Sequence, residues 1–166
     1  IFMDALMIGL IVGGFILLIF GFWFFSTWNR LVRLEENANK SWADIDVLLK
    51  QRYDMIPNLV NIVKGYAEHE REIFEQFALA RQTAAGCLAQ GDVKGVGAAE
   101  GMLSGFMPKI NMVAEQYPDL KADTSFVNLQ NQLVALENQL ADRREFYNAS
   151  STNFNSAIQM IPTNFV

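Results

Sequence analysis

The sequence predicts an all-α protein, in which a single N-terminal transmembrane helix is followed by an elongated antiparallel bundle of long helices. One observation is an apolar segment near the start of the chain that holds no charged residue. The other is that apolar residues beyond this segment recur at alternating steps of three and four, the spacing of one helix face. No segment shows the period of two that marks a half-buried strand. We therefore expect a membrane anchor at residues 1–28 and a helical bundle at residues 29–166.

The anchor is the segment from Ala5 to Trp28, which contains no Asp, Glu, Lys or Arg. As a helix it would be about 36 Å long, and the hydrocarbon core of a bilayer is about 30 Å thick. A secretory signal peptide is the alternative. It would have a shorter apolar region, basic residues in front and a small-x-small cleavage site behind. Here the basic residues come after the segment, so we expect a retained transmembrane helix.

The residues that flank the anchor predict its position and orientation. Trp23 and Trp28 suit the interface, where an amphipathic ring lies among lipid headgroups. Asp4 is the one charge before the span, whereas Arg30 and Arg33 follow it. The positive-inside rule then places the C-terminal domain in the cytoplasm and the N-terminus outside the cell (inner) membrane.

Two glycines in the anchor, Gly9 and Gly13, have the GxxxG spacing that lets two helix backbones approach closely. Glycines are also common in such spans, so both a helix–helix contact and an accidental match remain open. The sequence begins with Ile1 rather than Met, and we expect that residues precede it in the protein.

The first part of the bundle is expected to be one long helix or a pair of helices. An apolar stripe runs from Leu31 to Ala84 and stays in phase across Pro57. Proline removes a backbone donor and clashes with the carbonyl four residues before it, which predicts a kink near Asp54. A complete break, with Asp54 capping a second helix, is the alternative.

The second part of the bundle is expected to hold two further helices. Six glycines in residues 86–105 predict a glycine-rich connection, a turn with a weak helix after it. A third helix is expected from Met102 to Tyr117. The last helix has the clearest stripe, from Phe126 to Ile161, with Asp123, Thr124 and Ser125 as candidate N-caps and Pro162 as its end.

Three polar residues near Pro57 interrupt the apolar stripe: Arg52, Asp54 and Asn58. A charged residue at a core position is costly unless it is paired, and such residues often determine helix register or partner choice. We expect Arg52 to pair with an acidic residue across the bundle, Glu137 being the candidate. These four are the candidate interaction residues. The alternative is that they lie at the edge of the stripe in solvent.

Composition argues against several functional classes. The net charge of −5 and the low isoelectric point make nucleic acid a poor partner. Cys87 and His69 each stand alone, so they do not supply the ligands of a zinc site. A di-iron bundle needs two Glu-x-x-His motifs. His69 lies in a charged stretch that suits an exposed face, where a Ser-His-Asp triad is hard to build. We expect no enzyme activity and no cofactor.

The runs from Trp42 to Val60 and from Lys64 to Glu70 closely resemble the LemA family. The later segments Tyr117–Ala122 and Phe126–Gln130 agree, as does Ile161–Pro162, so that the resemblance covers roughly residues 28–162. It implies an N-terminal transmembrane helix, a short outside N-terminus and a helical bundle. It implies no catalytic residues. One branch of the family takes part in building bacterial magnetosome membranes, which implies membrane organisation rather than catalysis.

The leading functional hypothesis is a structural or scaffolding membrane protein that forms homo-oligomers or holds partners at the membrane surface. The alternative is a single-span sensor or signalling adaptor with a cytoplasmic helical bundle. Helix continuity across residues 26–34 discriminates between them, because Ser26 and Thr27 could form a flexible joint.

Overall fold

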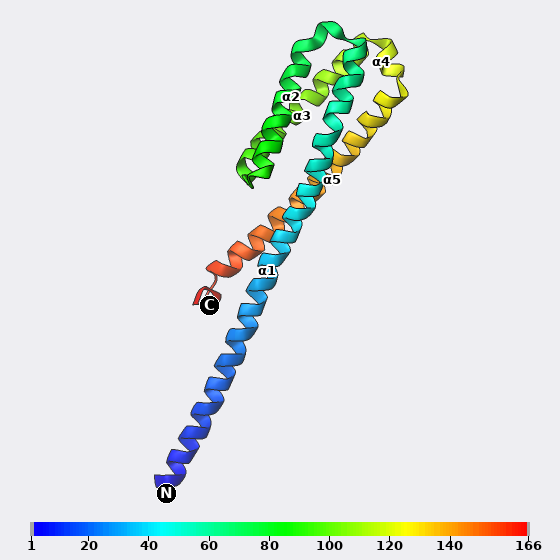
Figure 1. Ribbon diagram of the computed structural model, residues 1–166. Coiled ribbons are helices and arrows are strands. Elements are labelled where there is room, and N and C mark those ends of the chain that lie inside the picture. Colours follow the sequence, from blue (N-terminus) through cyan, green and yellow to red (C-terminus); the bar gives the residue numbers. More distant parts are fainter. Residues whose placement is uncertain (1, 166) are drawn as a thin grey trace. The chain divides into compact units, whose positions relative to one another are not determined.

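The computed structural model describes the backbone of residues 2–165 and the side chains of residues 7–67 and 69–165. Within this range the chain is α-helical and holds no strand, which confirms the all-α class (Figure 1). Its elements are α1 (Phe2–Tyr66), the 3-10 turn η1 (Glu68–Glu70), α2 (Arg71–Ala89), α3 (Val93–Gln116), α4 (Pro118–Ala122), α5 (Thr124–Gln159) and the 3-10 turn η2 (Thr163–Phe165).

The chain divides into two compact units. One comprises Asp44–Arg143, and the other comprises Ile1–Ala43 together with Arg144–Val166. We call them the bundle unit and the anchor unit. The helices α1 and α5 each contribute residues to both units.

Helix α1 is uninterrupted from Phe2 to Tyr66 and has Pro57 inside it. A complete break at Pro57, the alternative considered from sequence, is therefore wrong. Proline deprives the carbonyl of Tyr53 of its helical donor. The Nε of Arg81, from α2, donates to this carbonyl instead at 2.9 Å. Because the neighbouring helix supplies the missing hydrogen bond, the helix continues through the proline.

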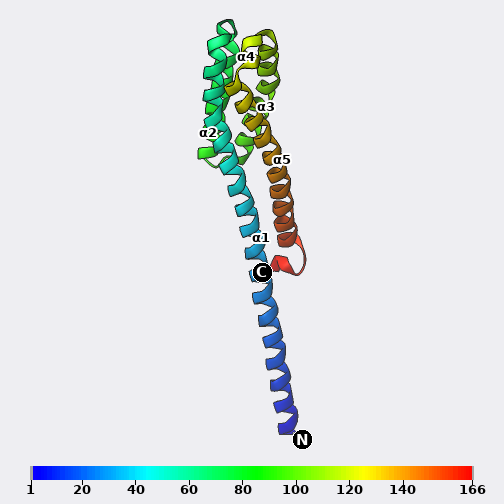
Figure 2. The same cartoon turned by 90° about the vertical axis from the view of Figure 1, so that its right-hand side faces the viewer.

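The bundle unit is built from antiparallel helices, with α2 and α3 side by side in both views (Figures 1 and 2). Its core combines residues of α1, α2 and α5 that lie on the predicted three-four stripes with residues of α3 that the sequence did not predict. Every helix longer than one turn contributes to it. The buried set includes Ile45, Leu49, Ile56, Leu59 and Val63 of α1, Phe74, Phe77, Ala80, Ala84 and Leu88 of α2, Val96, Leu103 and Ile110 of α3, and Phe126, Leu133, Leu136 and Leu140 of α5.

The predicted glycine-rich connection at 86–105 is wrong in extent. Helix α2 runs to Ala89 and α3 begins at Val93, so only residues 90–92 link them. Gly91 has a φ of 70° in this turn, which glycine adopts at no steric cost. Asp92 caps α3 by accepting a hydrogen bond from the amide of Gly95 at 3.0 Å. The third helix thus begins well before the predicted Met102, because burial of its apolar face offsets the low helix propensity of its glycines.

The end of the last helix also differs from the prediction. Helix α5 stops at Gln159, before Pro162, and residues 163–165 form η2. Ile158 and Ile161, expected on the buried stripe, are 41% and 78% exposed, whereas Ala157 is buried. Ala157 occupies the inward face here, Ile158 lies about 100° around the helix from it, and Ile161 lies beyond the end of α5.

Candidate functional site

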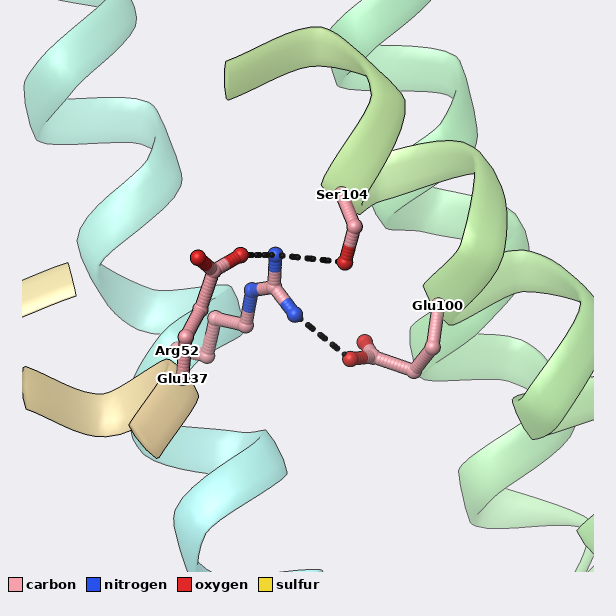
Figure 3. Close-up of polar contacts among 4 residues, drawn as sticks. All are labelled: Arg52, Glu100, Ser104 and Glu137. Carbon is pink, nitrogen blue, oxygen red and sulfur yellow. Dashed lines mark hydrogen bonds and ion pairs between the residues drawn. The ribbon is translucent and has the colours of Figure 1, made fainter. Parts of the chain in front are cut away.

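A polar cluster inside the bundle unit joins three helices (Figure 3). Arg52 of α1 donates from Nη1 to Oε2 of Glu100, on α3, at 2.7 Å. Its Nη2 donates to Oε1 of Glu137, on α5, at 2.8 Å, and to the hydroxyl of Ser104 at 3.4 Å. We call these four residues the Arg52 cluster. The guanidinium lies between the two carboxylates, each of which binds a different nitrogen.

Burial makes the Arg52 cluster costly to break. The side chain of Arg52 is 4% exposed and that of Glu100 is 1% exposed, whereas Glu137 is 34% exposed at the rim. A buried charge loses its hydration and needs both a counter-ion and good hydrogen-bond geometry to be tolerated. The planar guanidinium offers donors in a fixed fork that can serve two carboxylates at once. The cluster therefore joins the faces of α1, α3 and α5 that pack together.

The sequence predicted half of this cluster. The ion pair of Arg52 with Glu137 is confirmed, and its role as an interaction site stays a prediction. Asp54 and Asn58, predicted together with Arg52, are exposed, and their role as interaction residues stays a prediction. Residues two and six positions beyond Arg52 lie about 200° and 240° around the helix from it, on the solvent side. For these two, the alternative of a solvated stripe edge is correct.

Sequence reasoning missed Glu100, the most buried member of the cluster. The signal was present, since Glu100 follows the buried Ala99 and lies between Val96 and Leu103 on the apolar face of α3. It escaped notice because residues 86–105 were expected to be a turn followed by a weak helix, and no buried face was predicted there.

A second polar contact, at Pro57, joins α1 to α2. Besides its bond to the carbonyl of Tyr53, Arg81 places Nη2 at 3.9 Å from Oδ1 of Asp54. Asp54 is 82% exposed, so this ion pair is weak. The carbonyl contact is the structurally important one, because it satisfies a backbone acceptor that the proline deprives of its usual donor.

The predicted anchoring residues lie in the anchor unit. A Cβ built on Gly9 or Gly13 would meet nothing within 4 Å, so the GxxxG face is open. Trp23 is half-buried, with its ring centroid 5.7 Å from that of Phe20, and Trp28 is 50% exposed. The structure thus leaves the glycine face accessible to another helix.

The two basic residues after the span, Arg30 and Arg33, are exposed. The Nε of Arg33 donates to the carbonyl of Asn29 at 3.2 Å. The side chain of Asp4, used in predicting the orientation, lies outside the described residues. In the described part of the chain, one helix is long and apolar enough to cross a membrane, and none of its apolar window is buried.

Other groups that could carry chemistry are dispersed. Among the described residues, no three or more His, Cys, Asp or Glu side chains lie together as a metal-binding group. His69 is exposed and Cys87 is half-buried. An open groove of about 480 Å³ lies between α2 and α3, with Leu79 and Met102 exposed along it. Its lining is mostly apolar and includes two glycines, Gly101 and Gly105.

One known protein family matches most of the chain. The LemA family model matches residues 41–166, a range that contains the whole bundle unit and the Arg52 cluster. The chain belongs to the LemA family.

Three relatives of this LemA-family chain cover most of it. Magnetosome protein MamQ 2 of Paramagnetospirillum magneticum is 26% identical over 163 residues, covering 84% of this chain and 60% of the relative. Magnetosome protein MamQ of Magnetospirillum gryphiswaldense is 22% identical over 162 residues, with the same coverage. Protein LemA of Metamycoplasma hominis is 25% identical over 150 residues, covering 89% of this chain and 67% of the relative.

The chain spans about 60% of the length of the MamQ proteins it matches. None of the family and relative names states a catalytic activity. With its apolar N-terminal helix and these relatives, the LemA-family chain is a membrane-associated protein.

Proposed function

We propose that this protein is a single-span membrane scaffold that self-associates and holds protein partners at the membrane surface. The observation that carries the proposal is that helix α1 has two different surfaces along its length. Its first part is apolar and exposed, and its last part forms one wall of the bundle core. A helix built in this way attaches a folded bundle to a bilayer without needing a further domain.

Two surfaces support self-association or partner binding. In the anchor, Gly9 and Gly13 leave an open strip on which a second helix backbone could lie closely. In the bundle, the α2–α3 groove exposes Leu79 and Met102, 64% and 61% exposed. Apolar side chains exposed along a groove are typical of a protein-interaction surface.

The test is the mass of the particle in lipid. The full chain is placed in nanodiscs and weighed by native mass spectrometry, beside the double variant Gly9→Leu/Gly13→Leu. We expect a defined oligomer that the double variant dissociates, because two leucines block close approach of the helix backbones. The control is Gly14→Leu/Gly21→Leu, which adds the same bulk on a face about 100° away. A wild-type monomer would contradict self-association, and equal effects of the two double variants would contradict the glycine strip.

We further propose that the N-terminus is outside the inner membrane and the bundle cytoplasmic. The support is Arg30 and Arg33 directly after the span. Cys87 is the one cysteine in the chain, so a membrane-impermeant maleimide reports on the side where the bundle lies. We expect labelling only after the cells are permeabilised. Equal labelling of intact and permeabilised cells would reverse the orientation.

A second candidate is a sensor or signalling adaptor, and one observation favours it. Ser26 and Thr27 do not form a joint, because α1 is helical throughout residues 26–34. A continuous helix can transmit a rotation or a shift from the membrane. Inserting one alanine after Trp28 rotates the following helix by about 100°. A signalling role predicts changed amide hydrogen exchange in residues 44–143, whereas a scaffold role predicts none.

A further inference from the structure

The last part of the chain carries no charge and ends in exposed apolar side chains. After Glu145 there is no Asp, Glu, Lys, Arg or His. Beyond the end of α5, Met160, Ile161 and Phe165 are 60%, 78% and 76% exposed. We call residues 160–165 the apolar turn. Exposure of several large apolar side chains on so short a segment indicates a surface that is covered in the working protein.

Two contacts in the anchor unit define the register between α1 and α5. The ring centroids of Trp42 and Tyr147 are 5.4 Å apart, and the hydroxyl of Ser41 donates to that of Ser150 at 3.4 Å. The two helices run in opposite directions, and each rises about 1.5 Å per residue. In antiparallel helices, each residue farther along α5 lies beside a residue one position earlier in α1. Counting from the two contact pairs therefore places Gln159, the last residue of α5, at the level of residues 30–32 of α1.

The apolar turn therefore lies where the uncharged part of α1 ends. Both views show the C-terminal end of the chain (red) beside the blue stretch of α1 that belongs to the same unit (Figures 1 and 2). At this level α1 carries Trp28, followed by Arg30 and Arg33. An aromatic residue followed by basic residues marks the boundary between hydrocarbon and headgroups.

We propose that the apolar turn inserts into the headgroup region of the same bilayer that α1 spans, and so forms a second membrane attachment. The proposal rests on the proposed membrane span of α1. No Asp, Glu, Lys, Arg or His lies in this part of the sequence, so insertion would bury no ionised side chain, and burial of charge is the main cost of entering this region. Phe and Ile are suited to the boundary between headgroups and acyl chains. The attachment would hold both α1 and α5 at the membrane surface.

The experiment measures the depth of labels attached to single cysteines. In the Cys87→Ser full chain, Ile161→Cys, Leu17→Cys and Asn148→Cys are each labelled with an environment-sensitive fluorophore. The proteins are placed in vesicles of phosphatidylcholine and phosphatidylglycerol that contain nitroxide quenchers at a shallow or a deep acyl position. Leu17 lies inside the span. Asn148 is exposed on α5, about 16 Å farther from the membrane than Gln159.

We expect the Ile161 label to be quenched more strongly by the shallow nitroxide, the Leu17 label by the deep one, and the Asn148 label by neither. An unquenched Ile161 label beside a quenched Leu17 label would overturn the second attachment and leave the span intact. An unquenched Leu17 label would overturn the span and the second attachment together. A blue-shifted but unquenched Ile161 label would show that another copy of the chain, and not lipid, covers the turn.

A matched pair of substitutions sharpens the result. Phe165→Ser should reduce the quenching of the Ile161 label, since it removes an apolar side chain from the turn. Phe146→Ser, also in α5 and 59% exposed, should leave it unchanged, because Phe146 precedes Tyr147, which pairs with Trp42 far along α1 from the end of the apolar segment. Equal quenching in the two variants would contradict a specific role of the apolar turn.

Discussion

Replacing Arg52 with Met should destabilise the bundle strongly, because it leaves Glu100 as a buried anion without its cation. Glu100 is 1% exposed and receives the shortest bond of the cluster, 2.7 Å from the guanidinium. Removing one partner of a buried ion pair costs about 3–5 kcal/mol, since the remaining charge is neither paired nor hydrated. In a domain of 60–100 residues, 1 kcal/mol lowers the melting temperature by roughly 4–8 °C. We expect the melting temperature to fall by more than about 10 °C.

Two variants separate the buried charge from a general effect of losing a basic residue. Lys50→Met removes an ion pair on the same helix, but Lys50 is 65% exposed and bonds Asp46 at i,i+4. Such a pair contributes at most about 0.5 kcal/mol. The double variant Arg52→Met/Glu100→Leu removes both buried charges and should recover most of the lost stability, because an apolar replacement of a buried pair is often neutral.

The assay is thermal unfolding in detergent micelles, followed by the helical circular dichroism signal. Our reasoning would be refuted if Arg52→Met unfolded at the same temperature as Lys50→Met. It would equally be refuted if the double variant were as unstable as Arg52→Met alone, because the cost would then come from lost packing and not from a buried carboxylate that has lost the Arg52 guanidinium.

Three further predictions concern the helix ends and the proline. Arg81→Met should lower the free energy of unfolding by about 1 kcal/mol or more, and Pro57→Ala in the same chain should recover part of it by restoring a backbone donor; a urea titration of both variants checks this. Gly91→Ala should cost roughly 1 kcal/mol because of its positive φ, whereas Gly97→Ala, in open space on α3, should stabilise by about 0.5 kcal/mol; similar melting temperatures would contradict the assignment of the turn. The backbone amide of Phe126 and the hydroxyl of Tyr66 donate hydrogen bonds to Asp123, and they lower the pKa of its carboxyl below the ordinary value. Its contribution to stability is therefore present above about pH 4 and is lost as the pH falls through the lowered pKa. Asp123→Asn should retain the cap and lose that acid dependence, which melting curves at several pH values would show.

The sequence by itself determined the class of fold and most of the core. Three-four spacing identified the buried faces because a helix repeats every 3.6 residues, whatever packs against it. The uncharged segment before Arg30 predicted an anchor by its length and its flanking residues, since a bilayer of about 30 Å requires about 20 apolar residues. Arg52, a charged residue at a core position, indicated a buried ion pair, and Glu137 was correctly predicted as one of its partners.

Tertiary structure decided what local patterns leave open. The glycines of residues 86–105 have low helix propensity, yet most are helical because Val96 and Leu103 are buried against neighbouring helices. Whether Pro57 breaks α1 depended on Arg81, a residue more than twenty positions away that supplies the missing donor. Glu100 entered the Arg52 cluster only once α3 existed as a helix. The level of the apolar turn depended on the pairing of α1 with α5. In each case the deciding interaction joins residues far apart in the chain, and periodicity within one segment carries no information about such pairs.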